Sequence, residues 1–89
     1  MSSDTKIILR QIGAKIAYYR TLVGLSQTEL ADKMHTTQST ISKVESGNYN
    51  DNLSVVMLKD IADALEMDVS LLLEFNGFEK AMWDKKIGE

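Results

Sequence analysis

The sequence predicts an all-α protein of five short helices followed by a C-terminal tail. Three observations lead to this fold class. Apolar residues recur at helical spacing along nearly the whole chain, and no stretch of useful length alternates as a half-buried strand does. Residues typical of helix N-caps precede the apolar segments, and a glycine follows two of them. With 89 residues, the chain has room for one domain.

The first predicted helix runs from about residue 6 to residue 23, and Gly24 is expected to end it in a left-handed conformation. A second helix, about residues 27–34, begins at a capping box. In this box Ser26 accepts from an N–H of the first turn, and Glu29 reaches back to the Ser26 N–H. The apolar residues of the second helix are Leu30, Ala31 and Met34.

The third predicted helix spans about residues 38–46. Thr37 is its expected N-cap, and Gly47 is expected to end it. Residues 47–52 are rich in turn formers and predict an exposed loop. The loop contains Tyr49, for which two roles are open: stacking on a nucleic-acid sugar, or covering the edge of the core.

The C-terminal half is expected to hold two more helices and a tail. Ser54 would cap a fourth helix at about residues 55–66, and Asp68 a fifth at about residues 69–75. The remaining residues, 76–89, have apolar positions that fit a further amphipathic helix.

Composition excludes several classes of protein. The chain is 44% hydrophobic and 26% charged, as an ordinary globular domain is. It has no cysteine, which excludes disulfides, thiolate metal sites and a cysteine nucleophile. Its apolar runs are too short for a membrane span or a signal peptide, so a cytoplasmic location without membrane contact is expected.

Nothing in the sequence predicts an enzyme. The single histidine, His35, has no motif that would pair it with a serine nucleophile, and a metal site built from it is not expected. The five glycines are scattered, so the chain contains no glycine-rich phosphate loop. The sequence therefore predicts no catalytic residue, no metal and no cofactor.

The charges are distributed unevenly along the chain. Residues 1–50 carry six cations and four anions, a net charge of +2, whereas residues 51–89 carry four cations and nine anions, a net charge of −5. This asymmetry permits a polyanion at the N-terminal half and disfavours one at the C-terminal half.

The third helix carries the strongest signal of function. Two short helices joined by a tight turn form a helix-turn-helix unit, whose second helix can enter the major groove of DNA. Ile41 and Val44 must point inward, which leaves an acid-free polar face of Gln38, Ser39, Ser42, Lys43 and Ser46. Such a face suits close approach to base edges and phosphates. The one acid of this helix, Glu45, lies off the face and is expected to form a structural ion pair with Arg20.

Three segments together resemble the phage-repressor and Cro-like (XRE) helix-turn-helix family. They are Arg20 with Gly24-Leu25-Ser26-Gln27-x-x-Leu30-Ala31, then the run from Thr37 to Gly47, then Leu58-x-x-Ile61-Ala62-x-Ala64-Leu65. The resemblance covers roughly residues 9–73 and implies a five-helix repressor-like domain, 1–75, with a short C-terminal extension, 76–89. His35 and Glu66 stand where the family usually has glycine, and Leu53 where proline is common. His35 is therefore expected to hold a left-handed backbone at a cost of about 1 kcal/mol.

The resemblance also implies which residues would contact DNA. Those that would face base edges are Gln38, Ser39, Ser42 and Lys43. Gln38 has the amide geometry for adenine, and Lys43 can reach guanine O6 and N7. Those that would hold the phosphates are Gln27, Thr37, Ser46, Asn48 and Asn50. Contacts of this second kind position the protein and carry little sequence information.

The leading interpretation is a sequence-specific transcriptional regulator, a repressor that binds a palindromic operator in double-stranded DNA as a homodimer. One recognition helix reads only about four or five base pairs, so a single copy would select its site poorly. The dimer surface is expected at the fifth helix and the tail, through Leu72, Phe75, Phe78, Met82 and Trp83. The alternative is that these residues only close a small core.

Two further functions fit the sequence. Small single-domain relatives of this kind include antitoxins and the controllers of restriction–modification cassettes, which regulate their own operons. The acidic C-terminal half, residues 51–89, would then contact a toxin or another basic protein. A helical protein-interaction module without DNA binding would agree with the net charge of −3 and the lack of arginine on the third helix. The acid-free face argues against that module, which would have no need of it.

Overall fold

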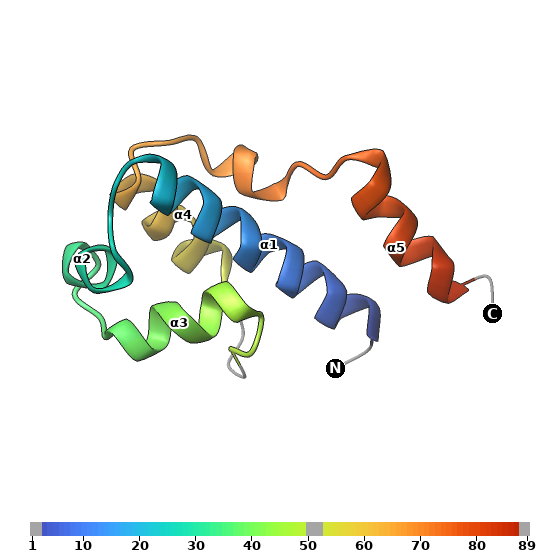
Figure 1. Cartoon of the computed structure of the whole chain (residues 1–89), viewed down its shortest axis with the longest axis horizontal. Coiled ribbons are helices and arrows are strands. Elements are labelled where there is room, and N and C mark those ends of the chain that lie inside the picture. The colour runs from blue at the N-terminus through green and yellow to red at the C-terminus, as the bar shows by residue number, and fades with distance from the viewer. Residues whose placement is uncertain (1–2, 50–52, 88–89) are drawn as a thin grey trace.

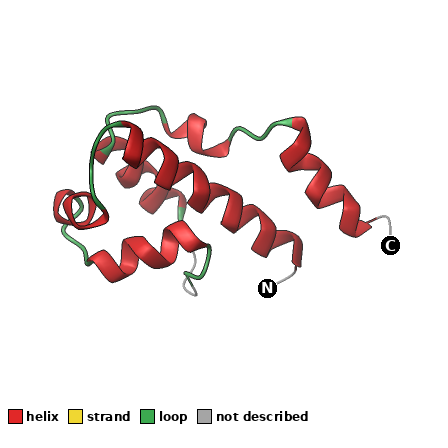
Figure 2. Cartoon of the chain, in the orientation of Figure 1, coloured by secondary structure: helices red, strands yellow, loops and turns green. Residues whose placement is uncertain are grey.

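The computed structural model describes residues 3–49 and 53–87, and in these ranges every regular element is a helix (Figure 2). The elements are α1 (Ser3–Leu22), α2 (Gln27–Lys33), α3 (Gln38–Ser46), α4 (Val55–Ala64), the 3-10 helix η1 (Val69–Leu73) and α5 (Gly77–Ile87). The predicted all-α fold class is confirmed. The tail contains the additional helix α5.

Most helix ends lie where the caps predict them. Gly24 and Gly47 are left-handed, with φ of 85° and 77°. The capping box of α2 has both hydrogen bonds, from the Glu29 N–H to the Ser26 hydroxyl and from the Ser26 N–H to the Glu29 carboxylate. Thr37 accepts from the N–H of Thr40 and so caps α3. These local bonds fix the two helices of the predicted helix-turn-helix unit.

Three predicted boundaries are corrected. The first helix begins at Ser3, before the expected residue 6. The fourth ends at Ala64, before the expected residue 66, because Glu66 takes a left-handed conformation with φ of 56°. The fifth is a 3-10 helix that ends at Leu73 rather than an α-helix to residue 75, since Glu74 is already extended.

The core is built around α1, the longest helix of the described chain, which lies at the centre of the molecule (Figure 1). The α2–α3 unit lies against one side of α1, and the segment from η1 to α5 lies along another. Buried apolar side chains from α1 to η1 fill the space between them: Ile12, Ile16, Leu30, Ala31, Ile41, Val44, Leu58, Ile61, Ala62, Leu65 and Leu72. This core holds α3 with its inner face fixed and its outer face in solvent.

Gly13 allows α1 and α3 to approach closely. A Cβ atom at this position would lie 2.4 Å from the carbonyl oxygen of Val44 and 2.5 Å from that of Glu45. Both neighbours are backbone atoms of α3, so a side chain at residue 13 would have to push the two helices apart. Nothing in the local sequence of either helix reveals this contact.

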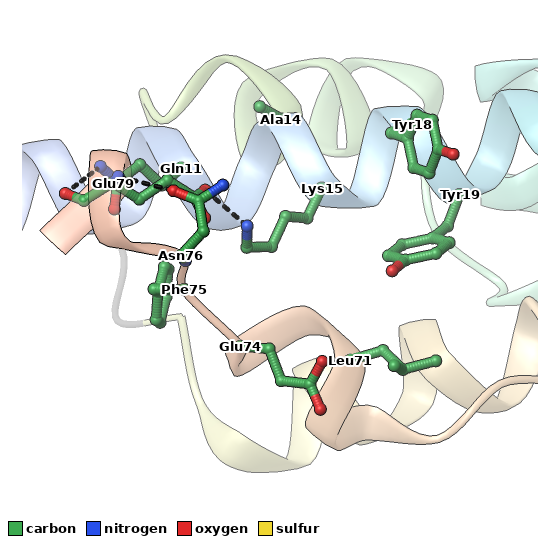
Figure 3. Close-up of a pocket in the computed structure, with 10 residues that line it drawn as sticks. All are labelled: Gln11, Ala14, Lys15, Tyr18, Tyr19, Leu71, Glu74, Phe75, Asn76 and Glu79. Carbon is green, nitrogen blue, oxygen red and sulfur yellow. Dashed lines mark hydrogen bonds and ion pairs between the residues drawn. The ribbon is translucent and has the colours of Figure 1, made fainter.

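The helix α5 is docked on the middle of α1. Gln11 donates from Nε2 to the Glu79 carbonyl at 3.1 Å and accepts at Oε1 from the Trp83 indole N–H at 2.9 Å. Lys15 forms an ion pair with Glu79 (Figure 3) and lies over the ring of Phe75, 5.1 Å from its centroid. Phe75 in turn packs edge to face on Trp83, with 5.1 Å between the ring centroids.

Candidate nucleic-acid interface

The turn between α2 and α3 is tight and includes one left-handed residue. His35 has φ of 56°, as its place in the sequence predicts. The N–H of Thr36 donates back to the carbonyl of Ala31 at 2.9 Å, which closes the end of α2. Thr37 then begins α3 at once. This connection sets α3 across the end of α2, as a helix-turn-helix unit requires.

The two faces of α3 have the environments that its pattern predicts. Ile41 and Val44 are buried, with 0% and 2% of their surface exposed. Gln38, Ser39 and Lys43 are exposed, and Ser42 is half-buried beside them. The side chains that the resemblance assigns to base contacts therefore share one accessible face, which contains donors, acceptors and a cation but no acid.

A chain of hydrogen bonds leads from α1 to this face. Arg20 donates to both Glu45 oxygens, from Nε at 2.6 Å and from Nη2 at 3.0 Å, so the expected ion pair is present and bidentate. Glu45 Oε1 also accepts from Gln27 Nε2 at 2.9 Å. Gln27 Oε1 accepts from Gln38 Nε2 at 2.6 Å. We call this set of four side chains the polar relay.

The inner part of the polar relay is sheltered from water. The side chains of Arg20 and Glu45 are 15% and 6% exposed. Hydrogen bonding to Glu45 raises the pKa of Arg20 above its ordinary value, so the guanidinium is charged at every relevant pH. Arg20 also donates from Nη1 to the carbonyl of Leu25 at 2.7 Å. These bonds tie α1, α3 and the segment before α2 into one unit.

The residues expected at phosphates differ in the donors they have free. Gln27 uses one Nε2 hydrogen for Glu45 and keeps the other. Ser46 donates its hydroxyl to the Lys43 carbonyl at 3.1 Å, so a phosphate contact would require that bond to break. Thr37 and Asn48 are exposed at the two ends of α3. Asn50 lies outside the described residues.

The residues expected at a dimer surface do not form one surface. Leu72 has 0% of its surface exposed and belongs to the core, so its assignment to the dimer surface was wrong. Phe75 and Trp83 are half-buried in the contact between α1 and α5. Phe78 and Met82 remain exposed, at 78% and 38%. Part of this set closes the molecule, as the alternative interpretation expects. Phe78 faces solvent, and Met82 is partly exposed while its sulfur accepts from Gln11 Nε2 at 3.5 Å.

The tyrosines have separate roles. Tyr49 packs against the core, which is one of the two roles open to it. Tyr19 also packs against the core, whereas its neighbour Tyr18 is 61% exposed. Tyr18, Tyr19 and Phe75 line a surface pocket between α1, η1 and α5 (Figure 3).

The hydrogen bonds of Gln27 to Glu45 and to Gln38 were not anticipated. The partners are 18 and 11 residues apart, and helical spacing informs only on neighbours three or four residues away. The only available signal was the resemblance, which places both glutamines on the DNA side.

Neither a membrane span nor a metal site is found in the described part of the chain. Of the helices described, none is long and apolar enough to cross a membrane. Within the same residues, no three histidine, aspartate or glutamate side chains are grouped so that they could hold a metal ion.

A bihelical unit whose second helix presents an accessible, acid-free polar face defines a helix-turn-helix DNA-binding domain. The model of the helix-turn-helix family HTH_3 matches residues 16–72. The chain belongs to this XRE/Cro-like family of DNA-binding regulators, which are not enzymes. The matched residues include all of α2, α3, α4 and most of η1.

Solved structures agree with the family. The restriction-modification controller protein C.AhdI from Aeromonas hydrophila is 33% identical, with a TM-score of 0.66, over 72% of this chain and 94% of that chain. Two structures of the clp gene regulator ClgR from Corynebacterium glutamicum are each 24% identical, with TM-scores of 0.68 and 0.69. They match over 74% and 83% of this chain and over 83% and 72% of theirs, and they show the shared fold. The comparison with curated protein sequences gave no match.

Proposed function

We propose that the protein is a sequence-specific transcriptional repressor that places α3 in the major groove of double-stranded DNA. The observation that carries the proposal is the accessible face of α3, on which Gln38, Ser39 and Lys43 are exposed without a neighbouring acid. Ser42 completes the base-contacting set. Gln27, Thr37, Asn48 and, after release of its helix bond, Ser46 hold the phosphates, together with Asn50. A cytoplasmic location and a DNA-binding domain of residues 1–75 with an extension of residues 76–89 belong to the same proposal.

Fluorescence anisotropy tests DNA binding directly. The protein is titrated against duplex from upstream of its own gene and against a scrambled duplex, between 50 and 200 mM salt (roughly the range over which phosphate contacts weaken). A regulator binds the first duplex selectively and loses affinity steeply with salt. Where neither duplex is selected, random-site selection supplies the operator. Absence of binding to any duplex at low salt contradicts the proposal and favours a protein-interaction module.

Two substitutions on α3 separate base contacts from general attraction. Gln38→Ala and Lys43→Ala are each expected to cost roughly 1–3 kcal/mol of binding free energy and to relax selectivity at a particular base pair. Lys33→Ala is the matched control, because this exposed lysine is the last residue of α2 and does not belong to the outer face of α3. Its loss is expected to weaken binding to selected and scrambled DNA by the same small factor.

Homodimerisation on a palindromic operator is the second part of the proposal. It is supported by the short reach of one recognition helix and by the exposed Phe78 and Met82 on α5. Sedimentation of a Phe78→Ser, Met82→Ser variant is expected to give the monomer mass where the native chain gives a dimer. Leu22→Ser, at an exposed apolar residue at the C-terminal end of α1, is the control. An unchanged mass in the α5 variant contradicts this dimer surface.

A second candidate function is control of a restriction–modification cassette. The likeness to the controller C.AhdI favours it, since this likeness covers 94% of that chain at 33% identity. An antitoxin that autoregulates its operon is the related alternative, and its acidic C-terminal half would contact a toxin. The neighbouring gene discriminates between them: a nuclease and methyltransferase pair supports the controller, and a small basic protein supports the antitoxin.

A further inference from the structure

The direction of every hydrogen bond in the polar relay is fixed from its inner end. A guanidinium has only donors and a carboxylate has only acceptors. Arg20 therefore donates to Glu45, and any side-chain amide that bonds to Glu45 has to turn its NH2 group toward it. Because the two charged side chains are 15% and 6% exposed, water competes little for these bonds.

This direction passes through Gln27 to the exposed end. Gln27 gives an Nε2 hydrogen to Glu45 Oε1 at 2.9 Å, so its own oxygen faces α3. Gln38 is then obliged to present its NH2 group to that oxygen, as it does at 2.6 Å. A flipped amide at Gln38 would set two carbonyl oxygens against each other, and a flip of both glutamines would set an oxygen against the Glu45 carboxylate.

The consequence is a fixed order of donor and acceptor on Gln38. After the bond to Gln27, it has one Nε2 hydrogen and its Oε1 lone pairs left for a ligand. In the major groove, adenine offers N7 as an acceptor beside N6 as a donor, whereas guanine offers two acceptors. An amide held in one orientation can bond to both N7 and N6 of one adenine. An amide that is free to flip can present its donor and acceptor in either order and so discriminates less between adenine and guanine.

We propose that Arg20 and Glu45 are positioning residues for base choice: through Gln27 they hold the Gln38 amide in the orientation that selects adenine. The inference rests on the proposed function, because it requires α3 to lie in the major groove. Neither charged residue touches DNA itself. They determine the orientation of the Gln38 amide, which is two hydrogen bonds away from Glu45.

The test compares two duplexes that differ at one base pair. Site selection with the native protein gives the operator, and each of its adenines is then replaced by guanine. The adenine read by Gln38 is the one whose replacement weakens binding by the native chain but not by the Gln38→Ala variant. Anisotropy at one salt concentration then gives the ratio of Kd values for the two duplexes. We expect a ratio of about tenfold for the native chain and of about twofold or less for Glu45→Gln, because a neutral amide at residue 45 leaves both orientations of Gln27 open.

Two more variants separate positioning from stability. Gln27→Met interrupts the polar relay in its middle while the Arg20–Glu45 pair stays, and it is expected to lower the ratio as Glu45→Gln does. Ile61→Val loosens the core in α4, where residue 61 is fully buried, and should keep the native ratio. In a Gln38→Ala background, Glu45→Gln should change the ratio no further.

The outcomes are distinguishable. A native protein that selects no site removes the proposed function, and the positioning role with it. If the native protein discriminates adenine and the Glu45→Gln and Gln27→Met variants keep its ratio of Kd values within a factor of two, only the positioning role is overturned. A ratio that falls equally in Ile61→Val also overturns it, since loss of stability would then explain the effect.

Discussion

The middle and the C-terminal end of α1 use polar side chains in opposite ways. In the middle, where α5 docks, Gln11 and Lys15 direct their polar groups at Glu79, Trp83 and Phe75, so these groups are used within the fold. At the C-terminal end, the chain of bonds from Arg20 leads outward and stops at the exposed Gln38. The first arrangement stabilises the fold, and the second prepares a side chain for a ligand. Substitutions in the two regions should therefore affect different measurements.

The largest effect is expected at Gly13, where α1 meets α3. Gly13→Ala puts a Cβ 2.4 Å from a backbone oxygen of α3, so the helices have to separate. We expect a loss of about 3 kcal/mol in the free energy of unfolding, as for severe overpacking. Urea denaturation followed by circular dichroism measures it. DNA affinity should fall as well, because this contact carries α3.

Gly77→Ala is the matched control for that substitution. Nothing lies within 4 Å of a Cβ at residue 77, and its φ is not positive. The change is expected to leave stability equal or slightly higher. Equal stability of the Gly13 and Gly77 variants would contradict the close approach of α1 and α3.

The next effect concerns only the contact between α1 and α5. Trp83→Ala removes the hydrogen bond to Gln11 and the edge-to-face contact with Phe75. We expect α5 to lose about 2 kcal/mol of protection, the sum of one hydrogen bond and one aromatic pair. Hydrogen exchange of the α5 amides measures this local loss. Lys80→Ala, at an exposed residue of the same helix, is the control and should change nothing.

The DNA affinity of the same variant, Trp83→Ala, is the second part of this prediction. The α5 contacts lie on α1 away from the polar relay. At protein concentrations at which the variant is fully dimeric, Trp83→Ala should therefore bind the operator with the native affinity. A loss of adenine discrimination in this variant would mean that the two regions are coupled through α1. The contrast between the two regions would then be wrong.

A smaller effect is expected in the turn of the helix-turn-helix unit. His35 and Glu66 both have φ of 56°, a conformation that costs a side chain energy and glycine little. His35→Gly and Glu66→Gly should each raise the free energy of unfolding by about 0.5 kcal/mol after the entropy of glycine is deducted. Thermal unfolding measures both. A destabilised His35→Gly beside a stabilised Glu66→Gly would indicate that the His35 side chain makes a contact that holds the turn.

The features that the sequence predicted best are helix caps and helix faces, which depend on residues close together in the chain. Ser26 and Thr37 cap helices through bonds to residues three positions on, and a sequence pattern contains all of that information. The inner and outer faces of α3 followed from its periodicity for the same reason. The 3-10 form of η1 was not predicted, because periodicity and an N-cap at Asp68 do not distinguish one short helical form from another.

Contacts between residues that are far apart in the chain could not be predicted from the sequence. The bonds between Gln11 and α5 join residues 68 to 72 positions apart, so the tail was expected at a dimer surface although Trp83 is engaged within its own chain. The need for Gly13 arises only when α1 and α3 are packed. In the same way, periodicity placed the predicted base-contacting set on the outer face of α3, but its connection through Gln27 required the fold.

The smallest effect is that of charge at the contact between α1 and α5. Hydrogen bonding to Lys15, and then to the Asn76 N–H, lowers the pKa of Glu79 below its ordinary value of 4.5. A carboxylate with a lowered pKa in the folded state contributes stability above its unfolded pKa and loses it as pH falls through the folded one. Glu79→Gln keeps an acceptor for Asn76 but removes the charge. At pH 7 we expect it to be less stable by about 0.3 kcal/mol, as for other partly exposed ion pairs.

The pH dependence of that difference identifies its cause. The fluorescence of Trp83, the single tryptophan of the chain, reports the docking of α5 during urea titrations. The stability difference between the native chain and Glu79→Gln should be constant from neutral pH down to about pH 5 and vanish as the pH drops well below 4.5. Arg20 and Glu45 lie outside this contact, so adenine discrimination by the Glu79 variant should equal that of the native chain. A difference that persists at low pH would show that the shape of the Glu79 side chain, and not its charge, stabilises the docking of α5.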